Sequence, residues 1–147
     1  MKLKVAQLIH RAFCIGILIF AGTVLFINQG KLYFSLAHTD TDLITAPIMV
    51  IVVLAIAPII SNKVLAPAEE ATDIPSKLAR YQTAFIVKAA LYESAALFNI
   101  VCCLITSNAL FMVFAMLTFF ALWWSKPTLA KAALTLGVQE SDLANEI

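Results

Sequence analysis

The sequence predicts an all-α integral membrane protein, a four-helix bundle forming a single transmembrane domain over residues 1–147. Hydrophobic residues make up 62% of the chain and charged residues only 13%, and the mean hydropathy is +0.93. A soluble domain is typically about 45–50% apolar and about 25% charged, so a water-soluble chain this poor in charge could not cover its surface. The apolar residues also fall into four runs separated by short polar segments, which sets the number of spans.

The first apolar run covers about residues 8–27 and follows a basic N-terminal segment. A spanning helix needs about 20 mainly apolar residues, because each residue rises about 1.5 Å. A cleaved signal peptide instead has a short apolar core followed by a small-residue cleavage site. This run continues to Ile27 and then meets Asn28 and Gln29, so we interpret it as a retained membrane helix.

The second apolar run, about residues 43–60, is rich in isoleucine and valine and carries two prolines. Pro47 falls in the first turn of the expected helix, where a missing N–H group costs little. Pro58 lies deeper, and we expect it to kink the helix or to mark its approaching end. The loop before this run holds His38, Asp40 and Asp42, which could be interpreted as metal ligands, but one histidine and two aspartates are common in loops, and we predict no metal site and no cofactor.

The third helix is expected to begin at Ser76, which follows Pro75 and has the properties of an N-cap, and to run to about Ile105. A helix of about 30 residues exceeds one bilayer crossing, so we place the span at about residues 82–105. The first turns of the helix, including Arg80, then lie at the membrane–water interface.

A turn of three uncharged residues, Thr106 to Asn108, makes the third and fourth helices a tight antiparallel hairpin. The fourth span covers about residues 109–124 and is dominated by phenylalanine, leucine and methionine. Trp123 and Trp124 close it, as expected for aromatic residues at a membrane–water interface. Beyond them, apolar residues at helical spacing predict a short C-terminal interfacial helix that stops near Gly137.

The distribution of lysine and arginine predicts that both termini are cytoplasmic, because basic residues concentrate in the cytoplasmic loops of membrane proteins. The N-terminus, the second loop and the C-terminal tail are basic, whereas the first loop has one lysine and the last turn has none. With four spans, these basic segments all fall on one side of the membrane. We predict the plasma (inner) membrane of a bacterium as the location, with the lipid bilayer as the surrounding partner.

Glu93 is the one carboxylate deep within a predicted span. An ionisable group at bilayer depth costs several kcal/mol unless it is paired, protonated or hydrated. Helical geometry places it on one face with Ala89, Ala96 and Leu97, and these mostly small neighbours indicate close packing against another helix. We favour a polar clamp that fixes helix packing over a proton or cation site. A proton relay normally needs a second carrier, and we expect no second buried acid and no buried histidine.

Lys88, Tyr92, Asn99 and Thr106 fall on a different sector of the third helix. Of these, Tyr92 and Asn99, seven residues apart, form a candidate polar seam facing a partner helix. Lys88 and Glu93 are five residues apart, which is a poor spacing for an ion pair on one helix. We expect Lys88 to extend its ammonium group towards the cytoplasm instead. The candidate site, whether for helix packing or for a proton or cation, consists of Glu93, Tyr92, Asn99 and Lys88. The candidate interface residues are Arg80, Trp123 and Trp124.

Three short motifs follow one another in the second half of the chain: R-Y-x-T from Arg80, A-L-x-E-x-x-A-x-F from Ala90, and an S/T-x-N turn ending at Asn108. With the Lys126-Pro127 pair, they resemble a pattern in small uncharacterised bacterial four-helix integral membrane proteins, over roughly residues 75–127. The resemblance implies the four-helix membrane fold and singles out Arg80, Glu93 and Asn108. It implies no activity or mechanism.

The sequence contains no Ser/His/Asp set, paired carboxylates, histidine-rich site or phosphate loop, so we predict that the protein is not an enzyme. A net charge of +1 gives no basic surface for nucleic acid. We predict a non-enzymatic membrane protein that acts as a homo-oligomer or as an accessory subunit with other membrane subunits. The alternative is a small transporter or channel in which Glu93 binds a proton or cation beside Tyr92 and Asn99.

Overall fold

The computed structural model describes residues 2–36, 41–68, 71 and 73–144, and over these ranges it is helical, with no strand. The predicted all-α class is therefore confirmed. The His38–Asp40 segment lies outside the described residues. The helices are α1 (Lys2–Ile27), α2 (Thr41–Leu65) with a 3-10 turn (Ala66–Ala68), α3 (Ile74–Thr106), α4 (Leu110–Trp124), α5 (Leu129–Leu136) and α6 (Glu140–Ala144).

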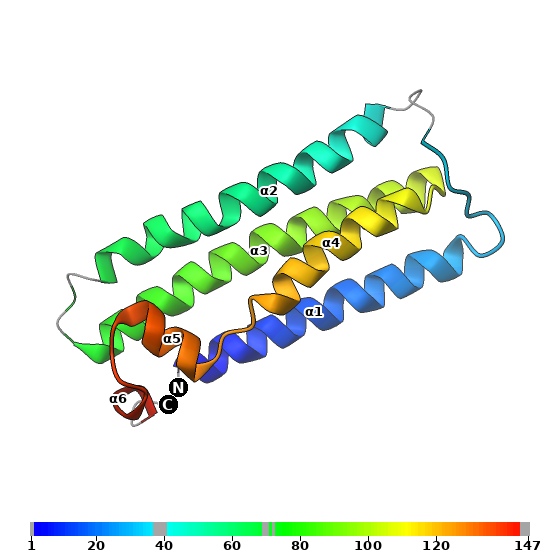
Figure 1. The fold of residues 1–147 in the computed structure, drawn as a ribbon. Coiled ribbons are helices and arrows are strands. Elements are labelled where there is room, and N and C mark those ends of the chain that lie inside the picture. The colour runs from blue at the N-terminus through cyan, green and yellow to red at the C-terminus, as the bar shows by residue number, and fades with distance from the viewer. Residues whose placement is uncertain (1, 37–40, 69–70, 72, 145–147) are drawn as a thin grey trace.

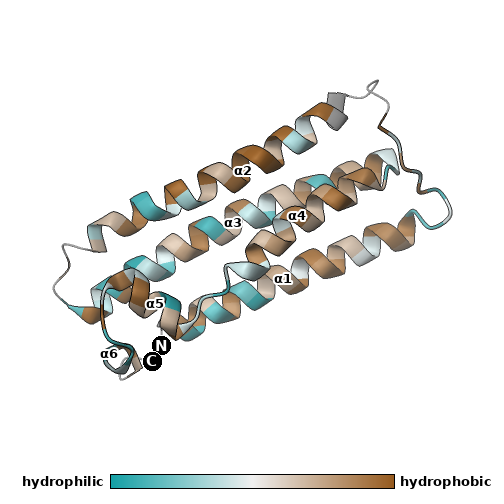
Figure 2. Cartoon of the chain, viewed as in Figure 1, coloured by the Kyte–Doolittle hydropathy of each residue, from teal (hydrophilic) through white to brown (hydrophobic). Residues whose placement is uncertain are grey.

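Three helices, α1, α2 and α3, are long and apolar enough to cross a membrane. α4 has 15 residues and rises only about 22 Å, less than the about 30 Å of a hydrocarbon core. α4 and α5 together would qualify as a fourth span, but they meet at a bend of 76°. Hydrophobic residues predominate along α1, α2 and α4, whereas hydrophilic residues are interspersed along α3 and gather near the two termini (Figure 2).

α3 is the central helix, because it packs against α1, α2 and α4, while α1 and α2 lie on opposite sides of it (Figure 1). Successive long helices run antiparallel, and both termini lie at the end that carries α5 and α6. Small side chains allow neighbouring backbones to approach closely inside a membrane. The buried small residues of α3 are Ala84, Ala89, Ala95, Ala96, Cys102 and Cys103.

The start of α3 differs from the prediction. Asp73, and not Ser76, is the N-cap, and its side chain accepts a hydrogen bond from the Ser76 backbone N–H at 2.9 Å. Pro75 occupies the first turn, where it needs no hydrogen-bond partner, so the helix begins upstream of it. The predicted stop of α5 is confirmed, because Gly137 ends that helix in the left-handed conformation, with φ of 64°.

α2 is longer at both ends than its predicted span. It begins at Thr41, so Pro47 lies in the second turn and not in the first. It continues to Leu65, so Pro58 does not end it. Polar Ser61 and Asn62 in the added turn mark the passage out of the apolar run, which is why the hydropathy pattern stopped short of the helix end.

The first loop is tied to the turn between α3 and α4. The Tyr33 N–H donates to the Ser107 carbonyl at 3.1 Å, and the Ala109 N–H donates to the Tyr33 carbonyl at 2.8 Å. Asn108 Nδ2 donates to the Ser35 carbonyl at 2.9 Å, and Asn108 Oδ1 accepts from the first N–H of α4 at 3.1 Å. Asn108 thus bonds to both segments, a role that the sequence motif marked without explaining.

Asn28 makes a second link at the same end. It directly follows α1, is only 5% exposed, and donates through Nδ2 to the Cys103 carbonyl of α3 at 3.1 Å. Buried amide groups of this kind stabilise a fold only when they are paired, so the two asparagines fix the ends of α1, α3 and α4 relative to one another.

The opposite end is closed by the tail. A separate apolar cluster joins the first turns of α1 and α3 to α5 and α6, and Gln7 Nε2 donates to the Pro127 carbonyl at 3.2 Å. The helix predicted as interfacial therefore packs on the rest of the protein through one face and exposes the other. The buried members of the cluster are Leu3, Leu78, Ala132, Ala133 and Leu143.

Replacing Asn108 by alanine should lower the free energy of unfolding by about 2 kcal/mol, because it leaves buried backbone groups of the loop and turn without partners. Reversible unfolding in mixed micelles measures this value. Gln29→Ala is the matched control, since Gln29 is exposed at the same end of the molecule. Equal losses in the two variants would contradict the role given to Asn108.

Candidate functional site

Polar side chains follow one sector of α3 along most of its length. Tyr81, Lys88, Tyr92 and Asn99 are spaced by seven, four and seven residues, so at about 100° per residue they lie within about 40° of one another. Tyr81 and Lys88 therefore lie on the same sector as the predicted seam of Tyr92 and Asn99. Glu93 lies about 140° around the helix from Lys88 and does not belong to the seam.

The seam opens into a cleft because α4 is short. α4 stops well before the N-terminal part of α3 (Figure 1), and α5 turns away at 76° instead of continuing along it. The space left between α2, α3, α4 and α5 is a cleft of about 560 Å³. Its polar lining residues are Ser61, Asn62, Tyr81, Lys88, Tyr92, Ser125, Lys131 and Thr135.

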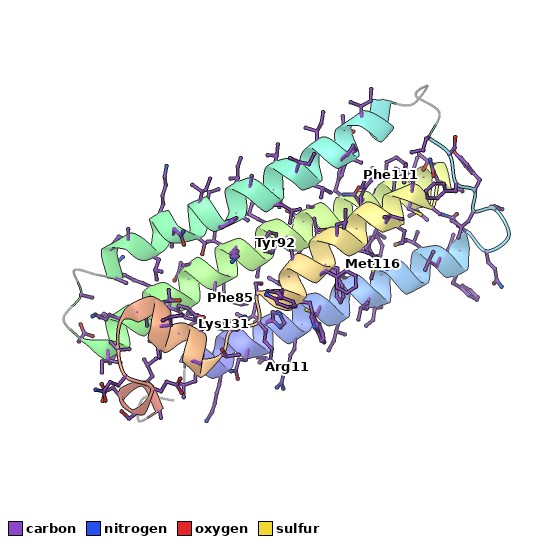
Figure 3. The ribbon with its side chains drawn as sticks, in the orientation of Figure 1. Arg11, Phe85, Tyr92, Phe111, Met116 and Lys131 are labelled. Carbon is purple, nitrogen blue, oxygen red and sulfur yellow. The ribbon has the colours of Figure 1, made fainter. Side chains whose placement is uncertain are left out.

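Lys88 is half-buried, and its Nζ lies 6.0 Å from the centre of the Tyr92 ring. It makes no salt bridge with any carboxylate of the described residues, Glu93 included. Lys131 Nζ lies at the same cleft and donates to the Trp124 carbonyl at 2.8 Å, which holds its charge at the C-terminus of α4. Figure 3 shows Lys131 and Phe85 near the end that carries α5, with Tyr92 further along α3.

The three predicted interface residues are all exposed, Trp123 at 57% and Trp124 at 84%. Trp123 contacts the Phe119 ring, with 6.1 Å between ring centroids, and faces the α1 side of α4. Trp124 lies at the cleft. Arg80 is exposed in the N-terminal part of α3, beyond the end of α4.

Asn99 is completely buried at the deep end of the seam. Its Nδ2 donates to the Ala95 carbonyl of the same helix at 2.8 Å. Its Oδ1 has no hydrogen-bond partner among the described residues. Asn99 therefore makes no hydrogen bond between helices in this part of the chain.

Glu93 lies on the side of α3 that faces α1, next to a glycine. A Cβ atom added to Gly16 would be 4.0 Å from Glu93 Oε1, and the Glu93 charge is within electrostatic range of the Cys14 thiol. The Glu93 side chain is half-buried, and no described residue donates a hydrogen bond to its carboxylate. Glu93 thus lies on a different side of α3 from Tyr92 and Asn99, as helical geometry predicts.

One buried polar residue was missed. We expected no buried histidine, but His10 is only 4% exposed, and its Nε2–H donates to the Leu122 carbonyl in the last turn of α4 at 3.0 Å. The expectation rested on the place of His10 near the start of its span, where its side chain could have reached water. It was wrong because the end of α4 covers this side chain. Cys14, one turn later, lies 3.9 Å from His10 Nε2, and this i, i+4 pair was the available signal.

The described residues hold no group of three or more histidine, cysteine or acidic side chains that could bind a metal ion. All three cysteines are free and buried. The polar features that remain are the cleft with its two lysines and the carboxylate of Glu93 beside Gly16.

Asn99→Leu should leave the free energy of unfolding within about 1 kcal/mol of the unsubstituted protein, because the lost side chain bonds only to its own helix. His10→Leu should lower it by about 1–3 kcal/mol, since that change breaks a buried contact between α1 and α4. Unfolding in mixed micelles measures both values. A large loss for Asn99→Leu would show that Oδ1 has a partner, such as water or an ion, and would favour a transport role for the seam.

The chain matches no protein-family model, no curated protein and no solved structure. The resemblance of residues 75–127 to small bacterial four-helix membrane proteins therefore stays a prediction.

Proposed function

We propose that this is a non-enzymatic integral membrane protein with four spans and cytoplasmic termini, in which Glu93 is a polar clamp for a helix of another chain. That chain is a second copy of the protein or a larger membrane partner. The observation that carries the proposal is the Glu93 carboxylate, half-buried beside Gly16 and without a donor among the described residues.

The depth of Glu93 supports this proposal. Two contacts between helices lie near the two ends of the apolar part of α1, and we use them as reference points for depth. They are the His10–Leu122 contact at one end and the Asn28–Cys103 contact at the other. At a rise of about 1.5 Å per residue, these reference points are about 27 Å apart, and Gly16 lies about 9 Å inside the nearer one. The carboxylate beside Gly16 would thus lie within the hydrocarbon, where a bare carboxyl group costs several kcal/mol.

The surface around Glu93 suits a second helix. Ala12 and Gly16 on α1 and Ala90 on α3 are all exposed, and they have the smallest side chains available. Small residues let a helix approach until backbone and side-chain contacts form, which is the main source of helix association in lipid. A hydroxyl, amide or ammonium group on the approaching helix could then donate to Glu93 Oε1 or Oε2.

A transport path is less well supported. Glu93 and the Tyr92–Asn99 seam lie on different sides of α3, so they do not line one passage. The Asn99 side chain is completely buried. Transport would need these groups to meet in a conformation different from this one.

Substitutions beside Glu93 should weaken self-association if the partner is a second copy. Glu93→Leu should raise the dissociation constant about fivefold, because an interhelical hydrogen bond in a membrane contributes about 1 kcal/mol. Glu93→Gln should keep association, since the amide still bonds. Light scattering of the purified protein in mild detergent, over a range of protein-to-detergent ratios, measures the constant.

The glycines of α1 supply a matched pair for the same measurement. Gly16→Leu should fill the space beside Glu93 and dissociate the oligomer, whereas Gly22→Leu should not, since Gly22 is exposed on another face and has no neighbouring atom within 4 Å of its position. Indistinguishable variants would contradict this surface. A protein that stays monomeric and captures no membrane partner after cross-linking in its native membrane would contradict the proposal as a whole.

Ion flux separates the clamp from the alternative. Proteoliposomes containing the protein or its Glu93→Gln variant should show the same proton and cation flux under an imposed gradient, because a clamp carries no ion. Flux that disappears in Glu93→Gln, while the variant still folds and associates, would replace the clamp by a proton or cation site.

A further inference from the structure

The cleft between α2, α3, α4 and α5 is a second candidate site, independent of Glu93. It has a volume of about 560 Å³, within the range of about 300–1,000 Å³ typical of small-molecule sites. It lies where the short α4 ends, at the level of Trp124. If the tryptophans mark the cytoplasmic membrane–water interface, the cleft opens at the depth of lipid headgroups.

The charges at the cleft have one sign. Lys88 and Lys131 both line it, and no aspartate or glutamate is among the lining residues. Lys131 is held in place by the carbonyls of Trp124 and Lys126, at 2.8 and 3.3 Å. Two ammonium groups fixed beside a partly apolar cavity repel each other, and an anion between them would remove that repulsion.

The remaining lining groups complement an anion with several oxygen atoms. Tyr81 and Tyr92 line the cleft on the α3 side, and Ser61 and Asn62 line it on the α2 side. The rim is apolar, because Leu134 and Trp124 are 86% and 84% exposed there. A phosphate group could thus bind among the lysines and hydroxyls, while an attached acyl chain lies against the rim.

We propose that this cleft binds a phosphate-bearing anion through Lys88 and Lys131, with the tyrosine and α2 side chains as additional donors. Two sources have this chemistry: the headgroup of an anionic phospholipid, and a free phosphate from the cytoplasm. The proposal does not depend on the partner helix at Glu93, which lies on another side of α3.

Trp124 provides the readout. In a Trp123→Phe background it is the single tryptophan of the chain, and it lies at the cleft. The protein is placed in phosphatidylcholine nanodiscs in which the same mole fraction of either phosphatidylglycerol or phosphatidylcholine carries brominated acyl chains. Stronger quenching by the brominated phosphatidylglycerol reports its enrichment at the cleft. The free-anion arm titrates inorganic phosphate into plain phosphatidylcholine nanodiscs and follows the unfolding temperature.

We expect phosphatidylglycerol to be enriched beside Trp124. The enrichment should fall about fivefold in the Lys88→Gln variant and about fivefold in the Lys131→Gln variant. Lys88→Arg should retain it, since charge is kept. Lys63→Gln is the matched control, because Lys63 is an exposed lysine that follows the cleft residue Asn62 on α2 but does not itself line the cleft. Lys131 is exposed, so its substitution still tests the site if Lys88→Gln fails to fold.

The outcomes separate the two sources. Enrichment that depends on both lysines identifies a lipid headgroup. A phosphate-induced rise in the unfolding temperature that is lost in Lys88→Gln or Lys131→Gln, without lipid enrichment, identifies a free anion. If neither effect appears, or if Lys63→Gln reduces the effect as much as Lys88→Gln, the cleft does not bind phosphate and the proposal is overturned.

Discussion

The close packing of α3 against three other helices is the constraint on which the rest of the structure depends. In the membrane that we propose as its location, lipid tails are as apolar as leucine, so the helices would gain little from apolar burial and would associate through close contact and hydrogen bonds. The buried alanines and cysteines of α3 permit that contact with α1, α2 and α4. The asparagines at one end and the contacts of His10 and the tail at the other then fix the register of the helices.

The polar features of α3 follow from how far each neighbour covers it. α4 ends at the level of Trp124, so half-buried Lys88 lines a cleft, and Tyr92, which is buried in the core, borders the same cleft. α1 brings Gly16 to Glu93, and a glycine leaves the carboxylate half-exposed where a larger side chain would have covered it. One helix therefore presents a cationic cleft on one side and a carboxylate on another, and we assign these to different partners.

Hydropathy and turn chemistry predicted the helical class, the α3–α4 turn and the end of α5, because these depend on local sequence. The helix starts were harder to predict from the sequence. Pro75 gave no sign that Asp73 is the N-cap of α3, and the apolar run of α2 gave no sign that this helix begins at Thr41. The site was predicted as a set of residue types but not as an arrangement. The expectation of no buried histidine was wrong for His10, since its burial depends on where the end of α4 lies.

We propose that another protein chain, and not lipid, covers the α1–α3 surface around Glu93. The most direct test is oxygen accessibility of a nitroxide at Ala90, one turn from Glu93, compared with a nitroxide at Ala55 of α2, in a variant without the three native cysteines. Both alanines are exposed in the isolated chain. In native membranes, we expect low oxygen accessibility at residue 90, because a protein chain covers it, and high accessibility at residue 55. Equally high accessibility at both positions would show that lipid, and not a partner chain, lies against Glu93.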